Sequence, residues 1–133
     1  MIFIDSNIPM YVIGTAHPNK ETALLLLERL INDGQKLVTN AEVFQEILHR
    51  YKAIHRIEAI QPAIDCLENI VDEVFPVTKE DVIAAKENIT SYCNLSSRDA
   101  LHVSHMKKYK IQKILSFDRG FDQISNLERL YRI

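Results

Sequence analysis

The chain has 133 residues, 47% of them hydrophobic, and a net charge of −2. This size and composition predict one domain over residues 1–133 with a single core, and the charge argues against a protein that holds nucleic acid through an overall positive field. No stretch approaches the roughly 18 uncharged apolar residues of a membrane helix. Cys66 and Cys93 lack metal-site spacing and are too few for a disulfide framework. We therefore expect a cytoplasmic protein without a membrane partner.

Short apolar runs typical of strands alternate with longer stretches in which apolar residues recur at helical spacing. The expected elements, in chain order, are a strand at 2–4, a short helix near Ile8, a helix at 20–32, a strand at 37–38, a helix capped by Thr39 or Asn40, a helix from 55 or 56 to 71 with Pro62 as a possible kink, a strand at 74–77, a helix from Thr78 to about 90, a helix at 98–108 capped by Ser96 or Ser97, a strand at 111–117 and an edge strand at 130–133.

This alternation predicts parallel βαβ units and an α/β fold, a three-layer α/β/α sandwich around a mostly parallel sheet of four to five strands. Ligands of such sheets bind outside the carboxyl ends of the strands. Asp5 and Asp118 each follow a predicted strand. Both are therefore candidate site residues.

Three aspartates stand at predicted junctions between elements, and each has an ordinary structural explanation as well. Asp5 can cap the short helix that follows it, Asp99 lies three residues after Ser96 as in a helix-start signature, and Asp118 can begin a turn that Gly120 completes. Their joint placement favours a site, because parallel topology brings such junctions to one sheet edge. Carboxylates gathered in one place repel and normally need a hard divalent cation.

Glu42 and Glu46 compete to supply a fourth acid from one predicted helix. A helical wheel places Glu42 nearly opposite the apolar face and Glu46 at its border, from which a side chain can reach a cleft beside the core. The alternative for Glu46 is an exposed ion pair with Arg50. Asp122 is either a helix cap or a further acid of the site.

Four segments of the chain together resemble the PIN-domain ribonucleases, and within them the VapC-like toxins of bacterial and archaeal toxin–antitoxin pairs. The segments are Phe3-Ile4-Asp5-Ser6-Asn7, Val43-Phe44-Gln45-Glu46-Ile47-Leu48, Arg98-Asp99-Ala100-Leu101-His102 and Ile114-Leu115-Ser116-Phe117-Asp118-Arg119-Gly120-Phe121-Asp122. Each segment is modest alone, but their order and spacing cover nearly the whole chain.

The resemblance implies a metal-dependent endoribonuclease that hydrolyses RNA phosphodiester bonds with one or two Mg²⁺ or Mn²⁺ ions. It also implies a cognate antitoxin as partner, and a homodimer formed through the early apolar helices. The residues it implies for the site are Asp5, Glu46, Asp99 and Asp118 as catalytic, metal-binding acids, with Asn7, Ser116 and Asp122 in support.

Other interpretations remain open at this level. A housekeeping PIN nuclease and a catalytically silent PIN-like module share the fold. A phospho-accepting receiver domain has a similar size, although Ser6-Asn7 follows Asp5 and Arg119-Gly120 follows Asp118 where that domain has paired acids and a lysine. His102 and His105 share a helix face and could bind zinc together with Asp99. Two basic clusters could face a phosphate backbone, and Tyr11 and Tyr51 could stack on bases or pack in the core. The clusters are Arg50, Lys52, His55 and Arg56, and Lys107, Lys108, Lys110 and Lys113.

Overall fold

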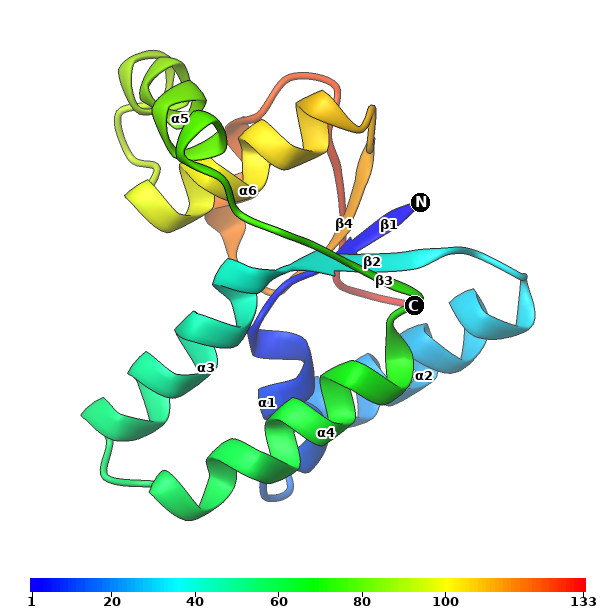
Figure 1. Ribbon diagram of the computed structural model, residues 1–133. Coiled ribbons are helices and arrows are strands. Elements are labelled where there is room, and N and C mark those ends of the chain that lie inside the picture. The colour runs from blue at the N-terminus through cyan, green and yellow to red at the C-terminus, as the bar shows by residue number, and fades with distance from the viewer.

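A computed structural model describes residues 1–133 as six α-helices around a five-stranded sheet (Figure 1). Two short 3₁₀ segments, Ile57–Ala59 and Arg119–Gln123, complete the regular structure. The elements are β1 (Ile2–Ile4), α1 (Asn7–Ile13), α2 (Pro18–Asn32), β2 (Leu37–Asn40), α3 (Ala41–Ala53), α4 (Ile60–Ile70), β3 (Glu73–Phe75), α5 (Lys79–Ser91), α6 (Ser97–Lys108), β4 (Lys113–Leu115) and β5 (Glu128–Leu130).

The sheet has the strand order β3-β2-β1-β4-β5, and every neighbouring pair is parallel. Helices α1 to α4 lie on one side of it, and α5 and α6 lie on the other (Figure 1). The predicted three-layer α/β/α sandwich is therefore confirmed. The central strand β1 is covered from both sides, and its residues 2–4 are all buried, as expected for a strand of a parallel sheet.

Polar caps begin the helices that carry the candidate acids. The Asn40 side chain accepts a hydrogen bond from the Val43 backbone N–H and starts α3. Ser96 accepts a bond from the Asp99 N–H and starts α6. Both caps satisfy backbone donors that have no partner inside the helix. The predicted caps of α3 and α6 are confirmed, with Asn40 rather than Thr39 and Ser96 rather than Ser97 as the capping residues.

Several predicted boundaries were wrong. Strand β3 spans residues 73–75 rather than 74–77. The helix expected from residue 55 or 56 begins at Ile60, because His55 adopts a left-handed conformation (φ 58°) and a 3₁₀ turn follows it. Pro62 lies in the first turn of α4, where a missing N–H costs nothing, so it does not interrupt the helix. Strand β4 covers only the centre of the expected run at 111–117. The last strand pairs at 128–130 rather than 130–133.

The topology sets where a site can form. From β1 the chain moves to β2 and β3 on one side, then crosses back to β4 and β5 on the other. Crevices at such a reversal, outside the carboxyl ends of the strands, are where open α/β sheets bind ligands. Here the ends of β1 and β4 are adjacent, and the Asp5 N–H donates to the Leu115 carbonyl at 3.2 Å. None of the helices is both long and apolar enough to span a bilayer.

Candidate active site

Asp5 leaves the end of β1 with its carboxylate buried, 3% of the residue being exposed. Its Oδ1 accepts a hydrogen bond from the Ser6 N–H (2.8 Å), and its Oδ2 accepts one from Ser116 Oγ (2.6 Å). Burial raises the pKa of this carboxyl group, although the charge of His102 and these hydrogen bonds oppose the rise. The two Asp5 oxygens are therefore fixed at the sheet edge, and their hydrogen bonds compensate only part of the cost of burying the negative charge.

Asn7 and Ser116 connect the ends of β1 and β4. Asn7 Nδ2 donates to Asp5 Oδ2 at 3.3 Å and to Ser116 Oγ at 3.2 Å. Ser116 Oγ also accepts from the Asp118 N–H at 3.0 Å, and Asn7 Oδ1 accepts from the Phe117 N–H at 3.3 Å. The two polar residues thus join Asp5 to the loop that carries Asp118.

Glu46 projects from α3 toward the same place and meets His102 of α6. Its Oε1 lies 2.6 Å from His102 Nε2, and one ligand atom from each of Asp5, Glu46 and His102 falls within 4.8 Å of the others. Burial opposes ionisation of Glu46, but the hydrogen bond and charge of His102 outweigh it and lower the Glu46 pKa. The pKa of His102 is raised by Glu46 against the effect of the ring's own burial. The alternative considered for Glu46, an exposed ion pair with Arg50, is not formed.

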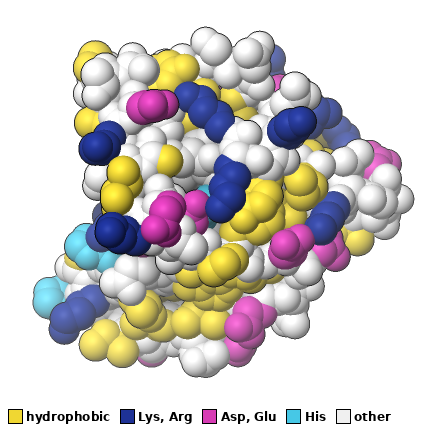
Figure 2. Space-filling model, turned by 45° about the horizontal axis from the view of Figure 1, so that its top comes forward, with side chains coloured by type: hydrophobic (Ala, Val, Ile, Leu, Met, Phe, Trp, Pro, Cys, Tyr) yellow, Lys and Arg dark blue, Asp and Glu magenta, His cyan; other side chains and the backbone are white.

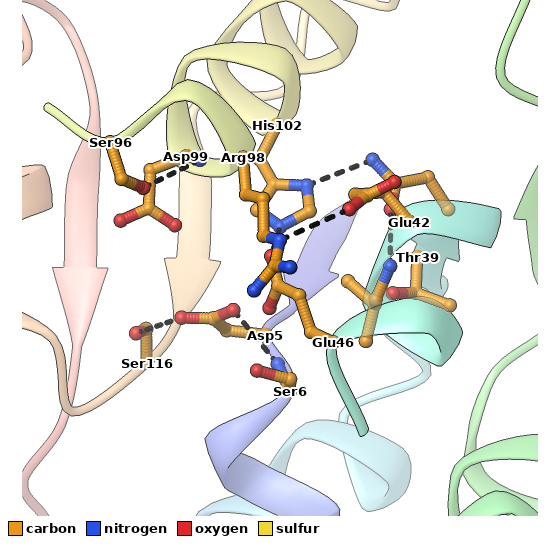
Figure 3. Close-up of polar contacts among 12 residues, drawn as sticks. Asp5, Ser6, Thr39, Glu42, Glu46, Ser96, Arg98, Asp99, His102 and Ser116 are labelled. Carbon is orange, nitrogen blue, oxygen red and sulfur yellow. Dashed lines mark hydrogen bonds and ion pairs between the residues drawn. The ribbon is translucent and has the colours of Figure 1, made fainter. Parts of the chain in front are cut away.

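Asp99 lies in the first turn of α6. Figure 3 shows Asp5, Glu46 and Asp99 reaching from β1, α3 and α6 into one space beside His102. Burial and the neighbouring charge of Asp5 raise the pKa of Asp99 to about 7, with smaller contributions from Asp118 and Glu46. Burial is the largest cause of this rise, and repulsion from the neighbouring acids adds to it.

Glu42 lies one turn before Glu46 and has a different partner. Its Oε1 lies 3.5 Å from Arg98 Nε, and Figure 3 shows this pair beside the acidic residues. Of the two candidates on α3, Glu46 is therefore the one that joins Asp5. Arg98 is a half-buried cation whose charge helps to lower the pKa of Glu46.

The two acids from the end of the chain lie farther out. Asp118 is exposed, and its Oδ1 accepts from the Gly120 N–H at 2.8 Å, as in the predicted turn. Asp122 lies within the 3₁₀ segment and forms two contacts with Arg129, at 2.7 and 3.0 Å. Arg129 in turn donates to the Ser116 carbonyl at 3.2 Å. Asp122 thus reaches the site only through Arg129.

The zinc site considered for His102, His105 and Asp99 does not form. The Nε2 of His105 faces Asp81 of α5, 3.1 Å from its Oδ2, rather than the acids at the end of β1. The side chains whose ligand atoms lie within 4.8 Å of one another are Asp5, Glu46 and His102, and this group includes neither His105 nor Asp99. Although His102 and His105 share a helix face, their Nε2 atoms face different acids, Glu46 and Asp81.

A groove of about 810 Å³ opens beside the acids and is lined partly by Glu46 and Asp99. It is also lined by two cations of the first predicted basic cluster, Arg50 and Arg56, and by the rings of Tyr11 and Tyr51. The face in Figure 2 has acidic side chains flanked by Lys or Arg on both sides, next to an apolar area. The acidic centre therefore lies at one end of a groove with positive and aromatic walls.

Comparison with known proteins assigns the family. The PIN domain model matches residues 2–127. The chain belongs to the PIN-domain family. Ribonuclease VapC13 of Mycobacterium tuberculosis is 52% identical over 130 residues, which cover 98% of this chain and 99% of that protein. Ribonuclease VapC2 of Methanocaldococcus jannaschii is 34% identical over 140 residues, covering 96% of this chain and 91% of that one. The chain is therefore a VapC-type PIN-domain protein, and the receiver-domain interpretation is set aside.

Solved structures agree on the fold. The VapC20 toxin of M. tuberculosis, which cleaves the sarcin–ricin loop, superposes with a TM-score of 0.74 at 22% identity, covering 92% of this chain and 93% of that one. VapBC2 of Rickettsia felis, bound to a DNA fragment from its promoter, gives 0.73 at 19% identity and covers 98% of both chains.

Sequence reasoning missed the part that Asn40 and His102 play beside Glu46. Asn40 was expected only as a cap, and His102 only as a zinc ligand. The Glu46–His102 contact joins residues 56 apart in the chain, so no local pattern reveals it. The one available signal was an apolar helix face on α6 interrupted by two histidines.

Proposed function

We propose that this VapC-type PIN protein is a metal-dependent endoribonuclease and the toxin of a toxin–antitoxin pair. The observation that carries the proposal is the convergence of Asp5, Glu46 and Asp99 at the end of β1, with the pKa of Asp99 raised to about 7. Carboxylates that lie this close together repel each other, and such clusters are typical of sites that bind a cation. The names of the VapC ribonuclease relatives support the same activity.

The donor set fits a hard divalent ion. Oxygen ligands are available from the acids, while His102 is already engaged by Glu46 at 2.6 Å, so Mg²⁺ or Mn²⁺ is favoured over zinc. Asp5, Glu46, Asp99 and Asp118 would hold one or two such ions. When bound, the metal supplies charge stabilisation to the phosphoryl oxygens and a bound water of lowered pKa.

The protein's own contribution is orientation. Ser6, Asn7 and Ser116 hold both oxygens of Asp5, so this carboxylate cannot rotate away. His102 holds Glu46 in the same way, and Asp99 is fixed by its place in the first turn of α6. We assign Asp5 and Asp99 to the principal ion, Glu46 to a second ion or the attacking water, and Asp118 to the outer edge. Asp122 supports Ser116 through Arg129.

The groove gives the proposed substrate a path. Its opening beside the acids exposes Arg50 and Arg56, which suit phosphates, and the Tyr11 ring, which could accept a base. Tyr11 already contacts Phe117 and His17 at ring-centroid distances of 5.3 and 5.0 Å. These features favour a single-stranded or looped RNA, because a base must be unpaired to stack on a side chain.

The proposed partners are an antitoxin and a second copy of the chain. Solved toxin–antitoxin assemblies that share the fold support the antitoxin, and the exposed apolar side chains of Leu24, Leu25 and Ile31 on α2 support a homodimer. Because its substrate is cellular RNA, we propose that the protein acts in the cytoplasm.

Cleavage of mixed RNA by the purified protein tests the activity. We expect cleavage with Mn²⁺ or Mg²⁺, none with EDTA, and a loss of at least about 100-fold in Asp5→Asn and Asp99→Asn. Glu73→Gln is the matched control, because Glu73 is an exposed acid at the opposite end of the sheet, paired only with Lys36. Cleavage that survives EDTA, or persists in both site variants, would reject the metal-nuclease proposal. A folded, metal-binding protein without any cleavage would indicate the silent module instead.

A further inference from the structure

Asn40 caps α3, but it is also buried and makes contacts that a helix cap does not need. It ends β2 and starts α3, and it is fully buried together with His102 and His105 of α6. Its single amide nitrogen lies 2.9 Å from His102 Nδ1 and 2.9 Å from His105 Nδ1. One side chain therefore joins the helix that carries Glu46 to two rings of the helix that carries Asp99.

The orientation of this amide follows from its other contact. Asn40 Oδ1 lies 3.0 Å from the Val43 backbone nitrogen, which can only donate. The oxygen must therefore face Val43, and the two N–H groups of the amide must face the two rings. Each ring then accepts at Nδ1 and, as a neutral imidazole, carries its proton on Nε2.

For His102 the consequence reaches the acids. A proton on Nε2 donates to Glu46 Oε1 at 2.6 Å, so the ring is a donor to the carboxylate and offers no lone pair to an ion there. A second proton on Nδ1 would set N–H against N–H at the Asn40 contact. Packing against Phe3, with ring centroids 5.2 Å apart, keeps the imidazole in this plane.

The far end of the arrangement is anchored as well. His105 contacts the Phe75 ring, and its Nε2 lies 3.1 Å from Asp81 Oδ2, in an alignment short of a hydrogen bond. Asp81 is itself held by the Thr78 N–H at 3.0 Å and by Lys108 Nζ at 3.1 Å. His105 is thus placed to hold the second N–H of the Asn40 amide and prevent its rotation.

We propose that Asn40 is a positioning residue: by donating to both histidines it holds His102 in the Nε2–H form, and His102 then aims the Glu46 carboxylate at the site. The hydrogen-bonding part of this inference stands alone, whereas its catalytic consequence rests on the proposed function. Outer partners that orient a metal-binding group typically contribute 10- to 100-fold to activity or metal affinity.

Asn40→Asp tests the proposal with little change in shape. One carboxylate oxygen can still accept from Val43, but the other can only accept, so the rings must turn a protonated Nδ1 toward it. Asn88→Asp is the matched control, since Asn88 is also buried and donates to α6 at the Ala100 carbonyl (3.0 Å) without touching either histidine.

Two measurements give separate answers. Because Glu46 raises the pKa of His102, long-range ¹H–¹⁵N spectra of the wild-type protein are recorded at increasing pH until His102 is neutral. They should then show His102 and His105 as Nε2–H rings, and Asn40→Asp should place a proton on Nδ1. RNA cleavage by Asn40→Asp should fall about 10- to 100-fold in kcat with little change in KM, and Asn88→Asp should keep the wild-type ratio. An Nδ1–H tautomer of neutral His102 in the wild type, or a folded Asn40→Asp with full kcat, would overturn the proposal. If Asn40→Asp does not fold, the wild-type spectrum decides. If the wild type cleaves no RNA, the spectrum still decides, and that failure belongs to the proposed function.

Discussion

The pKa of Asp99 links the acidic site to the stability of the whole protein. Burial and the charge of Asp5 raise its pKa to about 7 from a usual value of 3.8, so in the metal-free protein it retains a proton that an unfolded chain releases near pH 4. As the pH rises from about 4 to about 7, the unfolded state is favoured progressively, and the free energy of unfolding falls.

We therefore predict that the protein in EDTA is less stable at pH 8 than at pH 5, and that Asp99→Asn loses most of this difference. Each pKa unit corresponds to about 1.4 kcal/mol. The unfolded group is already ionised at pH 5, so the two units between pH 5 and the folded pKa of about 7 set an upper limit of about 2.7 kcal/mol on this difference. Because the side chain is partly exposed, we expect about 1–2 kcal/mol. Urea unfolding at the two pH values measures it. Equal pH dependence in the wild type and in Asp99→Asn would mean that other groups cause it.

Individual acids could be predicted from sequence to different extents. Asp5 follows a strand directly, so its place at the sheet edge was predictable, and the border position of Glu46 on its helix was enough to prefer it to Glu42. The Glu46–His102 and Asn40–His105 contacts span 56 and 65 residues. They depend on how α3 and α6 face each other across the sheet edge, which no local pattern encodes.

At the scale of elements, helices were easier to predict than strands. Helical apolar spacing and caps such as Thr78 and Ser96 mark where α5 and α6 start. Strands β3, β4 and β5 have three residues each, too few for a periodic pattern. Pairing with neighbouring strands defines their ends. For example, the Glu128 N–H donates to the Gln112 carbonyl at 2.8 Å, so the last strand begins at residue 128, before the predicted start at 130.

The cap of α5 makes a prediction of its own. Thr78 and Asp81 form a capping box, in which each side chain accepts from the other's backbone N–H, at 3.2 and 3.0 Å. Thr78→Ala should lower the free energy of unfolding by about 1 kcal/mol, which corresponds to roughly 3–4 °C in Tm. Thr90→Ala, at the exposed end of the same helix, should change Tm by less than about half as much. Equal Tm losses in both would show that the box contributes nothing specific.

On the scale of the whole molecule, a net charge of −2 coexists with a groove that has cationic walls. The acids account for this, because the ion they hold would contribute the positive charge that the protein lacks where the phosphate reacts. The first basic cluster lies along the groove through Arg50 and Arg56. Lys113 of the second cluster begins β4, at the opposite end of that strand from the acids.

This asymmetry predicts how salt affects RNA binding. Each contact between a cation and a phosphate of a single strand contributes about 0.7 to the slope of log K against log salt concentration. In Asp5→Asn, which binds RNA without cleaving it under the proposed function, adding Arg50→Gln should lower the slope by about 0.7, and adding Lys113→Gln should leave it unchanged. Fluorescence anisotropy of a labelled single-stranded RNA at several salt concentrations measures both. A slope that responds to Lys113 and not to Arg50 would place the RNA on the opposite face, away from the groove beside Glu46 and Asp99.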